Sequence, residues 1–158
     1  LAHKAKELDV NLPTLNSILV SNQHQIERAV EMVLRAGRRN VGMLGLSFKP
    51  DTDDLRESPM VALVERLIGK GLKLAIYDRE VELARLFGAN REFIENEIPH
   101  ISSLMRKELR EVIEIAEVIV IGKRDEEFRA VAESSERYVI DLVRLIEREG
   151  GNYQGVCW

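Results

Sequence analysis

The stretch VGMLGLSFKPDTDDLRESP, residues 41–59, decides the fold. It opens with an apolar run of strand type, continues into a charged loop and ends with Ser58 followed by Pro59. Serine is a favoured helix N-cap and proline is favoured at the first helical position, so we expect a helix to begin there. The stretch therefore predicts a buried strand, a loop and a helix in succession.

Short apolar runs alternate with helical patterns through the rest of the chain. Runs rich in β-branched and aliphatic residues are typical of strands buried on both faces. The predicted strands cover residues 41–46, 72–78, 117–122 and 137–142, with 153–158 as a last candidate. The predicted helices cover residues 60–70, 81–87, 103–116 and 126–134, and residues 90–102 form an irregular insertion with a short helix. We expect an α/β fold, a doubly wound Rossmann-like parallel sheet with helices on both faces.

A helical segment precedes this pattern. Apolar residues recur at spacings of three and four between residues 12 and 36, which predicts an amphipathic helix that Gly37 ends. We divide the chain into a helical segment, residues 1–37, and an α/β domain, residues 38–158. Because the chain begins with Leu1 rather than Met, we expect a piece of a longer protein.

Composition excludes several classes of protein. Of the 158 residues, 45% are hydrophobic and 32% are charged, which indicates a globular domain rather than a disordered segment. The net charge of −4 argues against a nucleic-acid partner. No apolar stretch approaches the roughly 20 residues that span a bilayer, and no signal peptide opens the chain. We therefore expect no membrane partner and a cytoplasmic location.

The charged loop after the first predicted strand is the candidate ligand site. In open α/β sheets, ligands bind outside the carboxyl ends of the strands, where Lys49 and Arg56 fall. A lysine and an arginine together suit a pyrophosphate, and the free N–H groups of the following helix would point the same way. The alternative is structural: Arg56 pairs with Asp53, Asp54 or Glu57 as part of a solvated loop.

Other candidate residues are weaker. The acidic group Asp51, Asp53 and Asp54 lacks the later glycine and glutamate of a calcium loop, and the histidines stand on separate segments, so we expect no metal. The single cysteine, Cys157, lies in an apolar segment and is interpreted as a small hydrophobic residue, so no catalytic residue is assigned.

A dinucleotide site of the chain's own is not expected. The sequence GMLG at residues 42–45 is not G-x-G-x-x-G, and a charged loop follows where a glycine-rich turn should be. Asp78 ends the second predicted strand, where a ribose-binding acid would lie, but it would serve equally well as a helix cap. We leave Asp78 out of the candidate site.

The string FKPDTDDLRESP, residues 48–59, resembles the signature after the first strand of the C-terminal domain in the UDP-glucose/GDP-mannose dehydrogenase family. The resemblance extends through residues 67–104 to the final GVCW and covers essentially the whole chain. The insertion and the terminal Cys-Trp favour GDP-mannose over UDP-glucose as the substrate. The helices before Arg38 resemble the end of the family's central dimerisation region.

This resemblance implies a chemistry and roles for two residues. The family oxidises the primary alcohol of a nucleotide sugar to a carboxylate with NAD, and a cysteine thiolate captures the aldehyde on the way. The motif of that cysteine and the G-x-G-x-x-G domain that mainly binds NAD are absent from this sequence, so the chain alone should be inactive. Lys49 matches the family lysine that contacts the nucleotide sugar, and Arg56 matches the arginine that reaches across to NAD.

The resemblance thus implies a C-terminal nucleotide-sugar-binding domain of an enzyme that makes GDP-mannuronate, as in alginate synthesis. A homodimer or higher homo-oligomer is expected to form through the N-terminal helix. Two alternatives stay open: a UDP-glucose or UDP-sugar 6-dehydrogenase, and a non-catalytic nucleotide-binding module that kept the fold.

Overall fold

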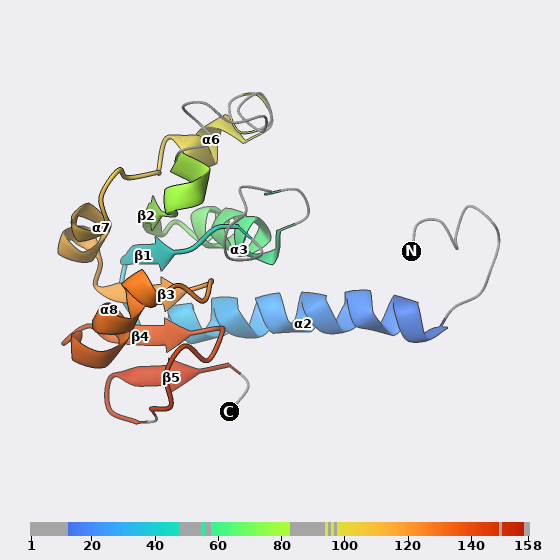
Figure 1. Ribbon diagram of the computed structural model, residues 1–158. Coiled ribbons are helices and arrows are strands. Elements are labelled where there is room, and N and C mark those ends of the chain that lie inside the picture. The colour runs from blue at the N-terminus through green and yellow to red at the C-terminus, as the bar shows by residue number, and fades with distance from the viewer. Residues whose placement is uncertain are drawn as a thin grey trace.

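The computed structural model describes residues 13–47, 55, 58–82, 94, 96, 98–148 and 150–156. Its centre is a parallel sheet with helices on both faces (Figure 1). The strands are β1 (Asn40–Leu44), β2 (Lys73–Tyr77), β3 (Val118–Ile121), β4 (Tyr138–Asp141) and β5 (Tyr153–Gly155). The helices are α2 (Pro13–Arg35), α3 (Pro59–Gly69), α6 (Pro99–Ser102), α7 (Leu109–Ile115) and α8 (Arg129–Ser134), with a 3₁₀ turn at Glu126–Phe128.

The strands follow the order β2-β1-β3-β4-β5, and every neighbouring pair is parallel. The chain goes from β1 to β2 on one side and then crosses to β3 on the other side of β1. The strand order therefore reverses between β1 and β3, and this switch point is where open α/β sheets place ligands. The predicted doubly wound class is confirmed.

Successive side chains along the strands point to opposite faces of the sheet and pack into two hydrophobic cores. Val41 and Met43 of β1 point to the core that α2 and α3 cover, whereas Leu44 belongs to the core under α7 and α8. Burial of both faces explains why the strands are almost continuously apolar in sequence.

Helix α2 is buried along only part of its length. Met32 and Val33 in its C-terminal half belong to the same core as the sheet. In its N-terminal half Ile18, Leu19 and Val20 are 49%, 57% and 56% exposed. Figure 1 shows this half extending beyond the carboxyl ends of the strands. Gly37 follows the helix at φ +65°, as the expected stop signal requires.

The helix predicted for residues 103–116 begins later than expected. Ile76 N of β2 donates to Leu104 O at 3.0 Å and Arg106 N donates to Ile76 O at 2.8 Å. Because β2 is the edge of the sheet, this single bridge around Met105 satisfies backbone groups of Ile76 that would otherwise be unpaired. The helical period of residues 103–108 was therefore overridden by a tertiary contact.

The expected helix at residues 81–87 falls mainly on residues that the structure does not describe. The insertion at 90–102 falls partly on such residues, and its described part contains the short helix α6. In the described part of the chain, no helix has both the length and the apolar character needed to cross a membrane.

Candidate functional site

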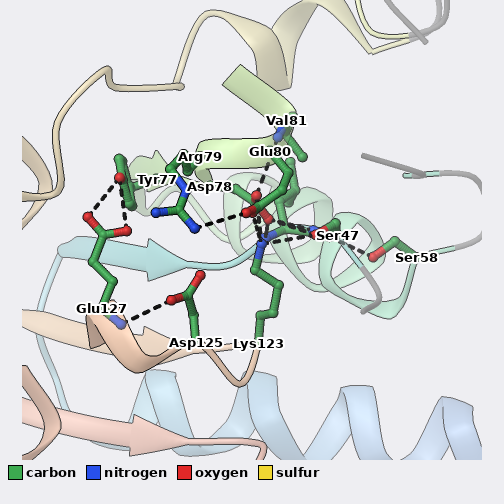
Figure 2. Close-up of polar contacts among 11 residues, drawn as sticks. Ser47, Ser58, Tyr77, Asp78, Arg79, Glu80, Val81, Lys123, Asp125 and Glu127 are labelled. Atoms are coloured by element: carbon green, nitrogen blue, oxygen red, sulfur yellow. Dashed lines mark hydrogen bonds and ion pairs between the residues drawn. The ribbon is translucent and has the colours of Figure 1, made fainter. Parts of the chain in front are cut away.

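The carboxyl ends of β1, β2 and β3 bring three chain segments together. Ser47 lies just after β1, Asp78 directly after β2 and Lys123 two residues after β3. Figure 2 shows their side chains pointing toward one another at this edge. All three residues are buried, with 0%, 0% and 2% of their surface exposed. Buried polar groups need partners, so each contact in this cluster matters.

Asp78 anchors the start of the loop that follows β1. Its Oδ2 accepts hydrogen bonds from Leu46 N at 2.7 Å, from Ser47 N at 2.9 Å and from Ser47 Oγ at 3.0 Å. Its Oδ1 accepts a longer bond from Val81 N at 3.4 Å, in the first turn after β2. The sequence left open whether Asp78 binds a ribose or caps a helix. The bond from Val81 N is of the cap type, and the bonds from Leu46 and Ser47 give Asp78 a further role at the loop after β1.

Lys123 completes the cluster from the other side of β1. Its Nζ lies 2.8 Å from Asp78 Oδ1, 2.5 Å from Glu80 Oε2 and 3.3 Å from Ser47 Oγ. Only 1% of the Lys123 side chain is exposed. The ammonium thus joins the loops after β1, β2 and β3 at the switch point.

The cluster keeps its charges at neutral pH. Burial alone would lower the pKa of Lys123, but the carboxylates of Asp78 and Glu80 outweigh burial and raise that pKa. Burial would raise the pKa of Asp78, but the Lys123 charge, aided by the Ser47 and Leu46 amides, lowers it. Lys123 is therefore an ammonium and Asp78 a carboxylate.

Two glycines let β1 and β3 approach each other beyond their last residues. A Cβ atom on Gly45, which has φ +88°, would lie 2.3 Å from Lys123 Cβ and 2.9 Å from Lys123 N. A Cβ on Gly122 would lie 2.8 Å from Gly45 O and 2.5 Å from Met60 Sδ. Gly45, the second glycine of the GMLG run, thus allows the backbone after β1 to pack closely against the backbone after β3 at the switch point.

Ser58 closes the far end of the same loop. Its Oγ accepts from Met60 N at 3.2 Å, which is the predicted N-cap of α3, and Pro59 stands in the first turn. The hydroxyl also donates to Leu46 O at 2.8 Å. The start and the end of the loop are thereby tied together.

The two sequence-predicted ligand residues, Lys49 and Arg56, lie outside the described residues, as does the acidic group Asp51, Asp53 and Asp54. Cys157 is also outside them. The roles given to these side chains remain predictions. What the structure describes is the anchored base of their loop, at Leu46, Ser47, Leu55 and Ser58.

The arginines described at this edge are engaged by the protein itself. Arg79 pairs with Glu80 at 3.3 Å, Arg124 Nε donates to Val143 O at 2.7 Å, and Arg144 lies 3.5 Å from Glu147. No group of three His, Cys, Asp or Glu residues suited to a metal ion occurs among the residues that the structure covers.

Tyr77 links β2 to the turn after β3. Its hydroxyl donates to Glu127, with oxygen distances of 2.9 and 3.1 Å, and Glu127 N donates to Asp125 Oδ1 at 3.0 Å (Figure 2). Burial and the contact with Glu127 raise the pKa of Tyr77 well above its usual range. Tyr77 therefore stays protonated and acts as a donor.

A largely apolar cavity of about 270 Å³ lies beside the edge, between α2 and the start of α3. Ile26, Pro59 and Leu142 are among its walls, and Asn22 and Gln25 supply its amide groups. Among the described residues that line the cavity, none carries a charge.

Sequence reasoning missed Lys123 and Ser47. The rule that singled out Lys49, a charged residue following a buried strand, applies equally to Lys123 after the strand at residues 117–122. The signal was present, but the sequence could not show that β3 lies next to β1 and that Lys123 is buried against Asp78.

Comparisons with known proteins agree with this architecture. Residues 42–148 match the family described as UDP-glucose/GDP-mannose dehydrogenase family, UDP binding domain. A GDP-mannose 6-dehydrogenase of Pseudomonas putida is 48% identical over 163 aligned positions, which cover 100% of this chain and 37% of the relative. A UDP-glucose 6-dehydrogenase of Pseudomonas aeruginosa is 35% identical over 83 positions, which cover 49% of this chain and 18% of the relative.

A solved structure matches closely. The crystal structure of a ternary complex of GDP-mannose dehydrogenase from Pseudomonas aeruginosa superposes with a TM-score of 0.92 and 45% identity, covering 99% of this chain and 37% of that one. The present chain thus spans little more than a third of the length of these relatives.

Proposed function

The chain belongs to the UDP-glucose/GDP-mannose dehydrogenase family, and on that premise we propose that it is the C-terminal, nucleotide-sugar-binding part of an NAD-dependent enzyme that oxidises GDP-mannose to GDP-mannuronate. The observation that carries the proposal is the 48% identity to a GDP-mannose 6-dehydrogenase over an alignment that covers the whole chain. The sequence match to the UDP-glucose 6-dehydrogenase of Pseudomonas aeruginosa is 35% identical and covers only 49% of the chain. The product points to polysaccharides that contain mannuronate, such as alginate.

The loop between β1 and α3 is the proposed nucleotide-sugar site. It leaves the sheet at the switch point, and Asp78, Lys123 and Ser58 hold its base. Lys49 is proposed to contact the nucleotide sugar and Arg56 to reach the NAD. A lysine offers a compact charge and an arginine a planar fork, so both suit phosphate oxygens.

The described residues do not fit an NAD site of their own. A ribose-binding acid must have a carboxylate oxygen open to the ligand, but Asp78 is fully buried and each of its two oxygens already accepts at least two bonds from the protein. The loop after β1 also lacks the glycine pattern that brings a helix start close to a pyrophosphate. We therefore assign NAD binding mainly to a part of the enzyme outside this chain, assign no catalytic residue here, and expect the isolated chain to be inactive.

Assembly is proposed to use α2. Its exposed apolar residues Ile18, Leu19 and Val20 would be covered in a homodimer or higher homo-oligomer. We propose a cytoplasmic enzyme. The single cysteine of this chain, Cys157, has no second cysteine within the chain to pair with, which is consistent with that location.

The test is NADH formation by the full-length protein that carries this chain. NAD is supplied with either GDP-mannose or UDP-glucose, and the NADH formed per sugar consumed is counted. We expect two NADH per GDP-mannose, because an alcohol becomes a carboxylate in two hydride transfers, and little activity with UDP-glucose.

The other outcomes discriminate between the alternatives. Turnover of UDP-glucose in place of GDP-mannose would keep the reaction and overturn the substrate. Absence of turnover with both sugars, combined with measurable binding of one, would favour the non-catalytic nucleotide-binding module.

A further inference from the structure

We propose that Lys123 is a positioning residue for nucleotide-sugar binding: it fixes Asp78 and, through Asp78, the base of the loop after β1, without contacting the ligand. The ligand named here rests on the proposed function. The positioning itself rests on the contacts of four buried or half-buried side chains, Ser47, Asp78, Glu80 and Lys123 (Figure 2).

Lys123 has no donor left for a ligand. A lysine ammonium has three N–H donors, and three protein oxygens lie within bonding distance of Nζ, on Asp78, Glu80 and Ser47. The side chain is also shielded from solvent. A phosphate could reach this charge only if one of these bonds were broken, which distinguishes Lys123 from a typical anion-binding lysine.

Asp78 passes the constraint on to the loop. Lys123 holds Oδ1, whereas Oδ2 accepts the backbone N–H groups of Leu46 and Ser47. When Oδ1 is held in place, the rotation of the carboxylate is fixed. The direction in which Oδ2 accepts hydrogen bonds from the loop is then fixed as well. Because Lys123 follows β3 and Asp78 follows β2, the pair spans β1 and clamps its end from both sides.

Leu46 transmits the constraint to the far end of the loop. Its N–H is held by Asp78, and its carbonyl accepts from Ser58 Oγ at the N-cap of α3. A shift of Leu46 would therefore move both ends of the loop. Displacements of about 1 Å at a substrate-positioning group can cost on the order of a hundredfold in rate.

Charge adds a second reason for the pair. Asp78 and Glu80 carry two negative charges at the base of a loop proposed to receive a diphosphate. Lys123 contacts both carboxylates and is the cation that Asp78 contacts, whereas Glu80 also pairs with Arg79. Without the ammonium, Asp78 would be a buried carboxylate without its cation and would repel an anionic ligand. Loss of Lys123 should thus weaken ligand binding both by misplacement and by repulsion.

The experiment compares Lys123→Met with the double variant Lys123→Met/Asp78→Asn in the full-length protein, with Lys73→Met as control. Lys73 is an exposed lysine at the opposite, amino end of β2. Two quantities are measured: KM and kcat with GDP-mannose, and the hydrogen-exchange rates of the Leu46 and Ser47 amides. The double variant serves where Lys123→Met alone fails to fold, because it removes the buried unpaired charge.

We expect Lys123→Met to raise KM for GDP-mannose on the order of tenfold to a hundredfold, with a smaller change in kcat, and to speed exchange at Leu46 and Ser47. A loss of folded protein alone would lower the apparent kcat and leave KM unchanged. The double variant should regain stability but keep the raised KM, because the link from β3 to the loop is still missing. Lys73→Met should match the unaltered protein.

Three results would overturn the proposal. Unchanged exchange at Leu46 and Ser47 in Lys123→Met would show that Lys123 does not hold the loop. Faster exchange with an unchanged KM would show that the loop base does not serve the ligand. If both KM and the exchange rates returned to the values of the unaltered protein in the double variant, Lys123 would only neutralise the charge of Asp78 and would not position the loop. If the unaltered protein turned over neither GDP-mannose nor UDP-glucose, the ligand named here would be wrong together with the proposed function. Hydrogen exchange at the Leu46 and Ser47 amides would still test whether Lys123 fixes the base of the loop.

Discussion

The Ser58 hydroxyl donates a 2.8 Å hydrogen bond to the carbonyl oxygen of Leu46, 12 residues earlier in the chain. The same hydroxyl accepts from Met60 N at the start of α3. One oxygen atom thus couples the helix start to the end of β1. The loop between them is held at its base even though it is rich in charged residues and contains Pro50.

Replacing Ser58 with alanine should destabilise the protein by about 1–3 kcal/mol, because the N-cap bond is lost and the buried Leu46 carbonyl loses a donor. Urea denaturation measures this change. Ser103→Ala is the control, since Ser103 Oγ makes an exposed bond to His100 O and should matter less. Equal effects at the two serines would contradict the coupling.

Gly45→Ala should be far more harmful than Gly71→Ala. Both glycines have positive φ, +88° and +79°, so both substitutions carry a backbone cost of about 1–2 kcal/mol. Only at Gly45 would the new Cβ collide with Lys123, whereas nothing lies within 4 Å at Gly71. We expect Gly45→Ala to cost at least about 1–3 kcal/mol more, measured by thermal or urea unfolding. Similar losses in both variants would show that the close approach relaxes at no cost.

Asp78 should make stability depend on acid pH. Its folded pKa lies below the unfolded value, so its contribution is fully present above about pH 4 and is lost as the pH falls through the folded pKa. The raised pKa of Lys123 acts in the opposite direction, and its contribution disappears only above the ordinary lysine range.

The comparison is between the unaltered protein and Asp78→Asn, with the free energy of unfolding measured by urea from neutral pH down into the acid range. We expect the unaltered protein to be the more stable at neutral pH and the difference to shrink below about pH 4. A difference that stays constant across this range would mean that Asp78 titrates alike in the folded and unfolded states.

The two loop cations should affect different substrates in the full-length enzyme. Lys49→Ala is expected to raise KM for GDP-mannose, whereas Arg56→Ala should mainly weaken the use of NAD, because the residues are assigned to different ligands. Steady-state kinetics with each substrate varied in turn separates the two effects. Unchanged kinetics for NAD in Arg56→Ala would reject that role.

A charge on the exposed half of α2 should disrupt self-association. Leu19→Glu would place a carboxylate where an apolar side chain is 57% exposed, and burying it in an interface would be costly. Light scattering should then show a lower mass than for the unaltered protein. Gln23→Glu is the control for charge on the same exposed half, and a monomer in the unaltered protein would contradict association through α2.

Much of the fold followed from local pattern. Continuous apolar runs predicted buried parallel strands, Ser58 and Pro59 predicted the start of α3, and Gly37 predicted the end of α2, because caps and burial on both faces depend on neighbouring residues in the chain. The prediction failed at residues 103–108, where a bridge between Met105 and Ile76 at the edge of β2 interrupts the helical period.

By itself, the sequence determined the α/β class, the family and the loop that carries the proposed ligand residues. Only the tertiary structure decided what Asp78 and Lys123 do. The order of the strands brings residues that are 45 positions apart within 2.8 Å of each other across β1 and buries both. A lone lysine or aspartate in sequence suggests a solvent-facing ligand, but burial forces each charge to find its partner inside the protein.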